Sequence, residues 1–105
     1  GISTRLLESR GAVDSAVAAE MARSCAERFA NSCGVAKDIV LGVSSTGVAG
    51  PASQDGKPAG TVFLAACLGE NIQVAEFLFQ GGRAEVRNQA TAEALKLAGS
   101  LLSQL

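Results

Sequence analysis

An uninterrupted apolar run near the middle of the chain limits the possible folds most strongly. Thr61–Leu68 reads TVFLAACL and contains no charged side chain. Strands with one face in water alternate apolar and polar residues, whereas unbroken apolar strands are covered on both faces. The run therefore predicts a central strand with a packed layer on each side. It is far shorter than the roughly 18–20 apolar residues that cross a bilayer, and no other stretch reaches that length.

Two more strands are predicted beside this run. Residues 39–45 (IVLGVSS) are apolar and β-branched and turn polar at their end, which is typical of a buried strand that leads into a loop. Residues 68–71 predict a tight turn and residues 72–79 a third strand, so a hairpin follows the central run. Because three strands make a narrow sheet with apolar edges, we expect the sheet to continue into residues outside these 105.

Helical patterns flank the strands. Residues 15–31 predict a helix with Asp14 as its N-cap and Gly34 as its terminator. A second helix is predicted over Arg83–Leu102, after a Gly-Gly break. The order of helix, strand, loop, strand, strand and helix indicates an α/β domain with at least one antiparallel strand pair.

Apolar side chains repeat with helical spacing in both predicted helices. In the first helix they recur every four residues and predict its buried face: Val17, Met21, Cys25 and Phe29. In the second helix the predicted stripe is Ala90, Ala94, Leu97, Leu101 and Leu105, with Val86, Ala98 and Leu102 beside it. The charged residues Glu20, Arg23 and Glu27 of the first helix are expected to pair on a solvated face.

Charge and residue types exclude several classes of function. A net charge of −1 and a pI near 5.3 oppose nucleic-acid binding, which needs a basic surface. The three cysteines, Cys25, Cys33 and Cys67, show no C-x-x-C spacing, and the chain has no His, so we expect neither a metal site nor another cofactor. We expect the cysteines to be small buried side chains of a reduced, cytoplasmic protein.

The glycine-rich segment of residues 46–60 is the first candidate for a ligand site. It follows a predicted strand, and ligands of open α/β sheets bind beyond the carboxyl ends of strands. Its hydroxyl groups offer short donors and acceptors, although a plain glycine-rich connector would look the same. It is not a P-loop, because five residues separate Gly50 from Gly56 and Pro58 follows Lys57.

Two arginines at the start of the second helix are the other candidate. Arg83 and Arg87 are four residues apart and share one face. Cations oppose the helix dipole at an N-terminus, so their presence behind the Gly-Gly turn suggests a bound phosphate or carboxylate. The alternative is an internal ion pair, with these partners available: Glu85, Glu76 or Asp55.

The groups needed to activate a nucleophile are scarce in this chain. There is no His to act as a base, so a Ser or Thr nucleophile would need a Lys or another activating group. The three lysines, Lys37, Lys57 and Lys96, show no obvious dyad spacing. The residues themselves therefore indicate a binding surface without a nucleophile.

Four short motifs in these segments resemble those of a known family. TGVAGP at residues 46–51 and KPAGTV at residues 57–62 resemble the TGxAGP…KPxGTV signature of the CinA C-terminal family. GGR at residues 81–83, followed by Arg87, is similar to its GDRxxxR segment, and GAVD at residues 11–14 resembles its GAVS motif. Because the chain begins with Gly1 rather than Met, we expect residues 1–105 to be the C-terminal part of a single, N-terminally truncated CinA-type domain.

The resemblance implies both a fold and an activity. The fold is a three-layer α/β/α sandwich with a mixed sheet, part of which is missing from this chain. The activity is hydrolysis of the amide of nicotinamide mononucleotide to nicotinate mononucleotide and ammonia, in pyridine nucleotide recycling. The resemblance also implies a homodimer and, in many parent proteins, a preceding molybdopterin-binding-like domain.

Two departures from the family pattern affect the expected site. Gly82 stands where the family has Asp, so a carboxylate that would cap the helix or orient Arg83 is missing. The family's ESCTGG nucleophile motif and its YSNxxK motif occur nowhere in these residues, so no catalytic Ser or Lys is carried over. Thr46 is expected to support the chemistry only by hydrogen bonding. The expected substrate contacts are Ser45, Thr46, Gly47, Gly50, Arg83 and Arg87.

Two other interpretations remain open from the sequence. The chain could be a non-catalytic nucleotide-binding or regulatory module that uses the same pocket without hydrolysis. It could also be a stable core that mediates dimerisation or docking, which predicts an extensive apolar interface. Deamidase activity of the complete protein separates the enzyme from both.

Overall fold

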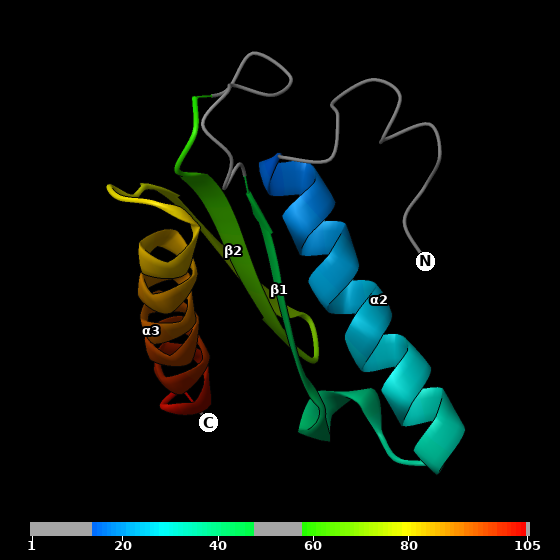
Figure 1. The fold of residues 1–105 in the computed structure, drawn as a ribbon. Coiled ribbons are helices and arrows are strands. Elements are labelled where there is room, and N and C mark those ends of the chain that lie inside the picture. Colours follow the sequence, from blue (N-terminus) through cyan, green and yellow to red (C-terminus); the bar gives the residue numbers. More distant parts are fainter. Residues whose placement is uncertain (1–13, 48–57, 105) are drawn as a thin grey trace.

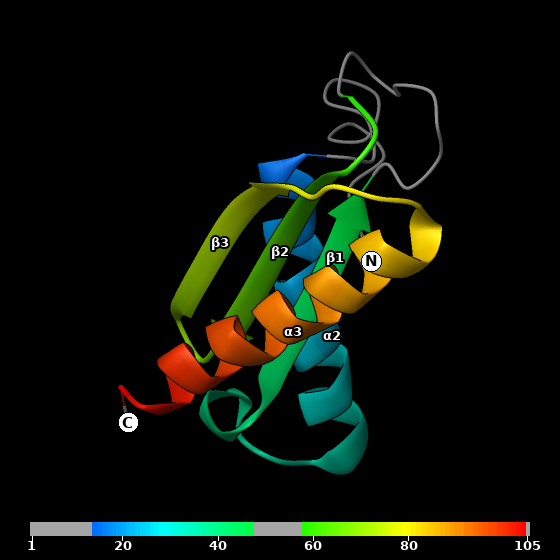
Figure 2. The same cartoon turned by 60° about the vertical axis from the view of Figure 1, so that its left-hand side comes forward.

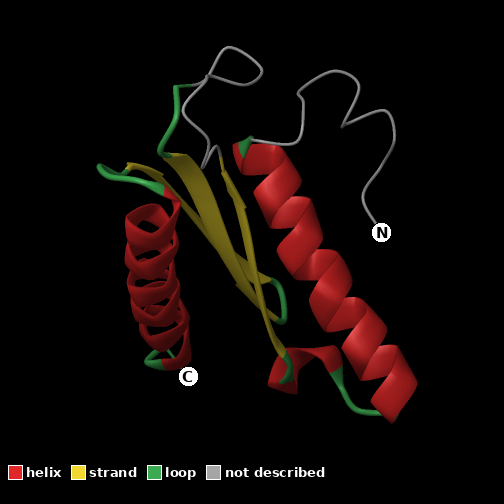
Figure 3. Ribbon diagram, viewed as in Figure 1, coloured by secondary structure: helices red, strands yellow, loops and turns green. Residues whose placement is uncertain are grey.

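The chain folds as two helices packed on a small sheet. The computed structural model describes residues 14–47 and 58–104. The elements follow in the order α2 (Ser15–Cys33), the 3₁₀ helix η1 (Lys37–Ile39), β1 (Leu41–Gly47), β2 (Thr61–Leu68), β3 (Asn71–Leu78) and α3 (Arg83–Leu102). Figure 1 and Figure 3 show α2 and α3 on opposite sides of the sheet. The predicted α/β/α layering is therefore confirmed.

The central strand is the one that the apolar run predicted. The sheet has the order β1-β2-β3, and all eight residues of β2 are buried. Both strand pairs are antiparallel. Within the described ranges the sheet is thus antiparallel throughout, and the parallel pairing of a mixed sheet is not among these strands.

The first strand begins and ends two residues later than predicted. Ile39 belongs to η1 and is 70% exposed, while Thr46 and Gly47 continue the ladder by pairing with Phe63 and Val62. The polar end of β1 stays in the sheet because β2 offers partners along its whole length. Two predicted loop residues of the candidate site are therefore held in a strand.

The predicted buried face of α2 is wrong in all but one residue. Phe29 is 56% exposed. The reason is a close approach of α2 to β1 at Gly42, where an added Cβ would collide with the Ala22 carbonyl oxygen and lie 3.0 Å from the Ala26 Cβ. Only small side chains fit between the two backbones. The buried residues of the helix are Val17, Ala18, Ala22, Ala26 and Ala30.

Both predicted caps of α2 are confirmed. The Asp14 carboxylate accepts hydrogen bonds from the backbone N–H groups of Ala16 at 2.8 Å and Val17 at 3.4 Å. Gly34 adopts the left-handed conformation with φ 67°, and its N–H donates to the Ala30 carbonyl. The helix runs through Cys33, two residues beyond the predicted end, because the left-handed cap at Gly34 terminates it.

The apolar stripe predicted for α3 mostly faces the sheet. Val86 packs with Val62 and Leu64 of β2, and Leu101 packs with Leu68. Ala90, Ala94, Leu97 and Ala98 are half-buried. Leu102 is 46% exposed, and Leu105 lies outside the described residues.

The prediction that the cysteines are buried holds for one of them. Cys67 is buried in β2, whereas Cys25 and Cys33 are exposed on α2, because the alanine stripe occupies the face toward the sheet.

The charged face of α2 forms ion pairs. Arg23 pairs with Glu20 at 2.8 Å as predicted, but Glu27 pairs with Lys37 at 3.1 Å instead. Among the described residues, no helix is both long and apolar enough to span a membrane.

Candidate functional site

Two of the predicted site segments meet at one end of the sheet. β1 ends there, and α3 begins there (Figure 1). Ser45, Thr46 and Gly47 are the last residues of β1, and Arg83 is the first residue of α3. The N-terminus of α2 points to the same end, so the positive ends of both helix dipoles converge near the end of β1.

These segments enclose a hollow of about 230 Å³, named here the arginine hollow. Five of the six predicted contacts line it, and the sixth, Gly50, lies outside the described residues. The other three lining residues, Val62, Val86 and Ala90, are aliphatic and were not predicted as site residues. The helical spacing of Val86 and Ala90 relative to the two arginines could have indicated them. The lining is Ser45, Thr46, Gly47, Val62, Arg83, Val86, Arg87 and Ala90.

The two arginines of the hollow have no carboxylate partner in the described part of the chain. Arg83 and Arg87 are exposed, and neither forms an ion pair there. The alternative of an internal pair with Glu85 or Glu76 is therefore wrong, while Asp55 lies outside the described ranges. Two like charges at the positive end of a helix dipole repel each other and the dipole. The hollow consequently favours an anion.

The turn before α3 is closed by side chains of the helix itself. Glu85 reaches back, and its Oε1 accepts a hydrogen bond from the Gly82 N–H at 3.5 Å. Gln89 Nε2 donates to the Gln80 carbonyl at 2.8 Å and to the Glu85 carbonyl at 3.0 Å. The contact from Glu85 satisfies the N–H of the N-cap residue itself, while Gly82 offers no side chain to cap the N–H groups of the first turn of α3. The Gly82 N–H is therefore engaged by Glu85, and the arginine side chains are the charged groups that line the hollow.

The hydroxyls at the end of β1 have different surroundings. The buried Ser44 Oγ donates to the Ala18 carbonyl of α2 and so fixes the strand to the helix. Ser45 is exposed and faces the α3 side. Thr46 is half-buried and already takes part in an interaction. Ser45 is therefore the hydroxyl most accessible to a ligand in the arginine hollow.

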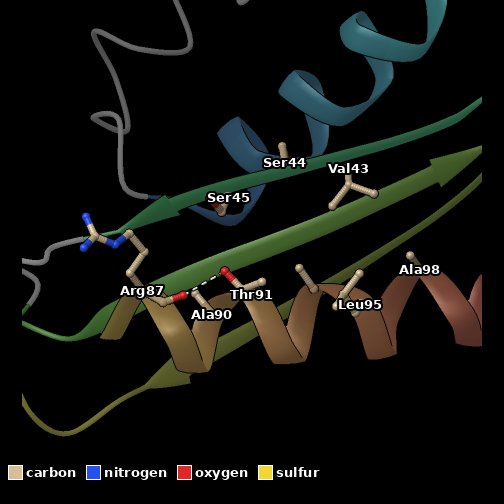
Figure 4. A pocket seen from close by; sticks show the side chains of 9 residues that line it. Val43, Ser44, Ser45, Arg87, Ala90, Thr91, Leu95 and Ala98 are labelled. Carbon is tan, nitrogen blue, oxygen red and sulfur yellow. Dashed lines mark hydrogen bonds between the residues drawn. The ribbon is translucent and has the colours of Figure 1, made fainter. Parts of the chain in front are cut away.

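A second, larger hollow runs alongside the first between β1 and α3. It measures about 360 Å³ and is named here the β1–α3 groove. Figure 4 shows Arg87 at one end of it, with the Thr91 hydroxyl donating to the Arg87 carbonyl at 2.9 Å. The arginine hollow shares three of its residues. The groove is lined by Val43, Ser44, Ser45, Arg87, Ala90, Thr91, Ala94, Leu95 and Ala98.

Two groups with shifted pKa values lie near the other end of the sheet. A hydrogen bond from Lys37 to the Glu27 carboxylate raises the pKa of the Lys37 ammonium. Burial raises the pKa of the Cys67 thiol, and Cys67 pairs with Gly42 near the start of β1. Neither group lines the arginine hollow.

The lining chemistry suits binding better than proton transfer. Hydroxyls and guanidinium groups donate hydrogen bonds to an anion, whereas no Asp, Glu or Lys of the described residues lines the hollow. The described residues also contain no group of three or more His, Cys, Asp or Glu that could hold a metal ion. The described lining can thus position an anionic ligand but supplies no general base.

The layers and the position of the hollow define a class of protein. The chain is an α/β/α domain whose candidate site lies beyond the carboxyl end of a strand, where such sheets bind ligands. The profile of the CinA C-terminal domain matches residues 1–102. The chain therefore belongs to the CinA C-terminal domain family.

Known relatives agree with this assignment. A CinA-like protein of Geotalea daltonii is 41% identical over 88 residues, which cover 83% of this chain and 19% of the relative. A CinA superfamily protein from Klebsiella pneumoniae superposes with a TM-score of 0.79 at 28% identity, covering 98% of this chain and 60% of the other. A CinA superfamily protein from Escherichia coli superposes with a TM-score of 0.73 at 32% identity, covering 99% of this chain and 55% of the other. The chain thus spans about a fifth of the curated relatives it matches.

Proposed function

We propose that this chain supplies the phosphate-binding part of a nicotinamide mononucleotide deamidase. One observation carries the proposal: Arg83 and Arg87 line a hollow at the end of β1 without a carboxylate partner among the described residues. Guanidinium groups bind phosphate through paired, charge-assisted hydrogen bonds. The family membership and the four sequence motifs support this ligand class over other anions.

In the proposed reaction the chain positions the substrate. The phosphate of the nucleotide lies against Arg83 and Arg87, and the Ser45 hydroxyl hydrogen-bonds to the ligand from β1. Hydrolysis requires a nucleophile that attacks the carboxamide carbon, a base that takes its proton and passes it to the leaving ammonia, and donors that stabilise the oxyanion. Water then hydrolyses the acyl-enzyme and releases nicotinate mononucleotide. The resemblance assigns a Ser and a Lys to these steps, in a part of the parent protein outside these residues.

The parent protein is proposed to have the organisation that the resemblance implies. Residues 1–105 form the C-terminal part of one CinA-type domain, and the domain acts as a homodimer in the cytoplasm. The free cysteines among the described residues suit a reduced compartment.

Ligand titration of arginine variants tests the phosphate contact. Arg87→Ala and Arg83→Ala are each expected to weaken the binding of nicotinamide mononucleotide by about 10–100-fold, which corresponds to the loss of about 1.5–3 kcal/mol from a charge-assisted hydrogen bond. Isothermal titration calorimetry measures the affinities. The matched control is Arg28→Ala on the exposed side of α2, which should change nothing. Equal affinities for all four proteins would remove the arginines from the site.

The lining favours one other function, a module that binds the nucleotide without hydrolysing it. No acid or base of the described residues lines the hollow, so binding and chemistry are separable. Ammonia release from nicotinamide mononucleotide, measured on the complete protein with its intact mass determined in parallel, separates the two. Tight binding without ammonia release would favour the non-catalytic module.

A further inference from the structure

We propose that Gln89 is a positioning residue for the anion site, because its side-chain amide fixes the turn from which Arg83 starts α3. The inference rests on the proposed phosphate contact of Arg83 and adds a residue that acts on this contact from outside the site. Gln89 lines neither the arginine hollow nor the β1–α3 groove. Its effect therefore reaches a ligand only through the backbone that carries Arg83.

The segment between β3 and α3 is weakly held by its own residues. Figure 2 shows it crossing from β3, at one edge of the sheet, to the start of α3 near the end of β1. Gly81 has a φ of 104°, which favours glycine, and Gly82 has no side chain to accept hydrogen bonds from the first helical turn. The helix dipole also repels the Arg83 guanidinium. Without a further contact, we expect this turn to fray.

The side chain of Gln89 supplies that contact. Its Nε2 carries two N–H groups, and it donates to the Gln80 carbonyl at 2.8 Å and to the Glu85 carbonyl at 3.0 Å. Gln80 lies before the glycine pair, and Glu85 lies after it. The Glu85 carboxylate adds only a longer bond, of 3.5 Å, to the Gly82 N–H. One amide therefore joins the two ends of the segment that contains Arg83.

The bonds of Gln89 act on Arg83 more than on Arg87. Arg83 lies between the two carbonyl groups that Gln89 holds, so the direction of its side chain depends on them. Arg87 lies a full turn further along α3, and its carbonyl accepts a hydrogen bond from the Thr91 hydroxyl at 2.9 Å. Its neighbour Val86 is buried against β2. Loss of the Gln89 amide should thus displace one guanidinium group and leave the other in place.

A double-mutant cycle on ligand affinity tests this selectivity. Gln89→Met keeps a neutral, unbranched side chain but removes the donor. We expect it to weaken the binding of nicotinamide mononucleotide to the 105-residue chain by about 3–10-fold. In an Arg83→Ala background the same change should have no further effect, whereas in an Arg87→Ala background it should keep its full effect. Isothermal titration calorimetry measures the affinities.

The matched control is Gln80→Met, because Gln80 contributes its backbone carbonyl to the contact and the change retains it. This variant should bind like the wild type. Equal losses from Gln89→Met in all three backgrounds would show a general structural role and overturn the proposal, as would an unchanged affinity. If Arg83→Ala itself bound normally, the phosphate contact of Arg83 would be refuted, and the positioning role with it.

A substitution at Gly82 separates positioning from direct contact with the ligand. An added Cβ there would lie 3.7 Å from the nearest carboxylate oxygen of Glu85, so a side chain fits. Gly82→Asn supplies an N-cap acceptor, and in the Gln89→Met background it should restore the affinity to within about twofold of the wild type.

Hydrogen exchange without ligand should follow the same order. Amides within residues 83–86 are expected to exchange at least roughly fivefold faster in Gln89→Met, because the first turn of α3 opens more often, and to slow again when Gly82→Asn is added. Unchanged exchange in Gln89→Met would contradict the fixing of the turn. Protection restored by Gly82→Asn without restored affinity would show that Gln89 contacts the ligand itself, and the positioning role would be wrong.

Discussion

Gly42 determines how closely α2 approaches the sheet. A Cβ at this position would collide with the backbone of the helix at Ala22 and crowd Ala26. The missing side chain lets a stripe of alanines become the buried face, so that larger apolar residues of α2 remain outside. A single small residue in a strand thus selects the face of a helix on the neighbouring layer.

Adding one methyl group at Gly42 should therefore be costly. Gly42→Ala is expected to destabilise the chain by about 1–3 kcal/mol, because the contact is with backbone that cannot move aside. Urea denaturation followed by circular dichroism measures the change. Gly99→Ala is the matched control, since an added Cβ meets nothing within 4 Å in α3 and should stabilise the helix by about 0.5–1 kcal/mol. A neutral Gly42→Ala would refute the close packing.

The three cysteines should differ in reactivity. Burial raises the pKa of the Cys67 thiol, so little thiolate forms and access is blocked, whereas Cys25 and Cys33 are exposed. With a disulfide reagent at pH 8 we expect two thiols to react rapidly and the third only after unfolding in urea. The shift also makes stability fall as the pH rises above the thiol's unfolded pKa, because the unfolded chain then releases a proton that the folded chain keeps. Three equal rates would contradict the burial of Cys67.

At the level of elements, the sequence predicts the type and order of the helices and strands better than it predicts which face of a helix is buried. The stripe through Phe29 and the stripe through Ala30 run side by side along α2. The larger residues give the stronger hydrophobic pattern, but Gly42 on another element decides which stripe is buried. The buried face of α2 is determined by a residue of β1 and not by the helix itself, so the periodicity of the helix sequence alone cannot predict it.

The candidate site shows the same division between local and tertiary information. Spacing, motif and position at the end of a strand predict Arg83, Arg87 and Ser45 as site residues, and the fold brings them together at one hollow. Val62 of β2 lines the hollow only because β2 lies next to β1 in the sheet, and no local sequence pattern predicts this strand order. The contact of Glu85 with the Gly82 N–H can be predicted from the sequence, because a glutamate at the third helical position can reach back to the N-cap.

The N-cap of α2 provides a test at the element scale. Asp14→Ala should destabilise the chain by about 0.5–2 kcal/mol, since the N–H groups of Ala16 and Val17 lose their acceptor at the helix start. The free energy of unfolding in urea is again the measurement. Asp38→Ala removes an exposed carboxylate within η1 and is the control, with an expected change within about ±0.5 kcal/mol. Equal losses would show that charge, and not capping, is responsible.

For the whole molecule, stability is concentrated in one strand. β2 is buried along its full length because α2 and α3 cover its opposite faces. The layers are offset at the edges, where Val43 on β1 and Val74 and Leu78 on β3 stay partly exposed. A domain of this size has few other apolar contacts to rely on. The centre should therefore tolerate substitution far less than either edge.

Truncating a side chain at the centre of β2 should lower the free energy of unfolding strongly, whereas truncating one in the groove should leave it nearly unchanged. Leu64 is fully buried at the middle of β2, and Leu64→Ala is expected to cost about 2–5 kcal/mol through lost burial and a residual cavity. Because small domains are stable by only about 5–15 kcal/mol, this variant should unfold at much lower urea. Leu95→Ala should stay within about ±0.5 kcal/mol in the chain alone, because its side chain is already 70% exposed. If Leu95→Ala were as damaging as Leu64→Ala, the groove would be part of the chain's own core and not an open face.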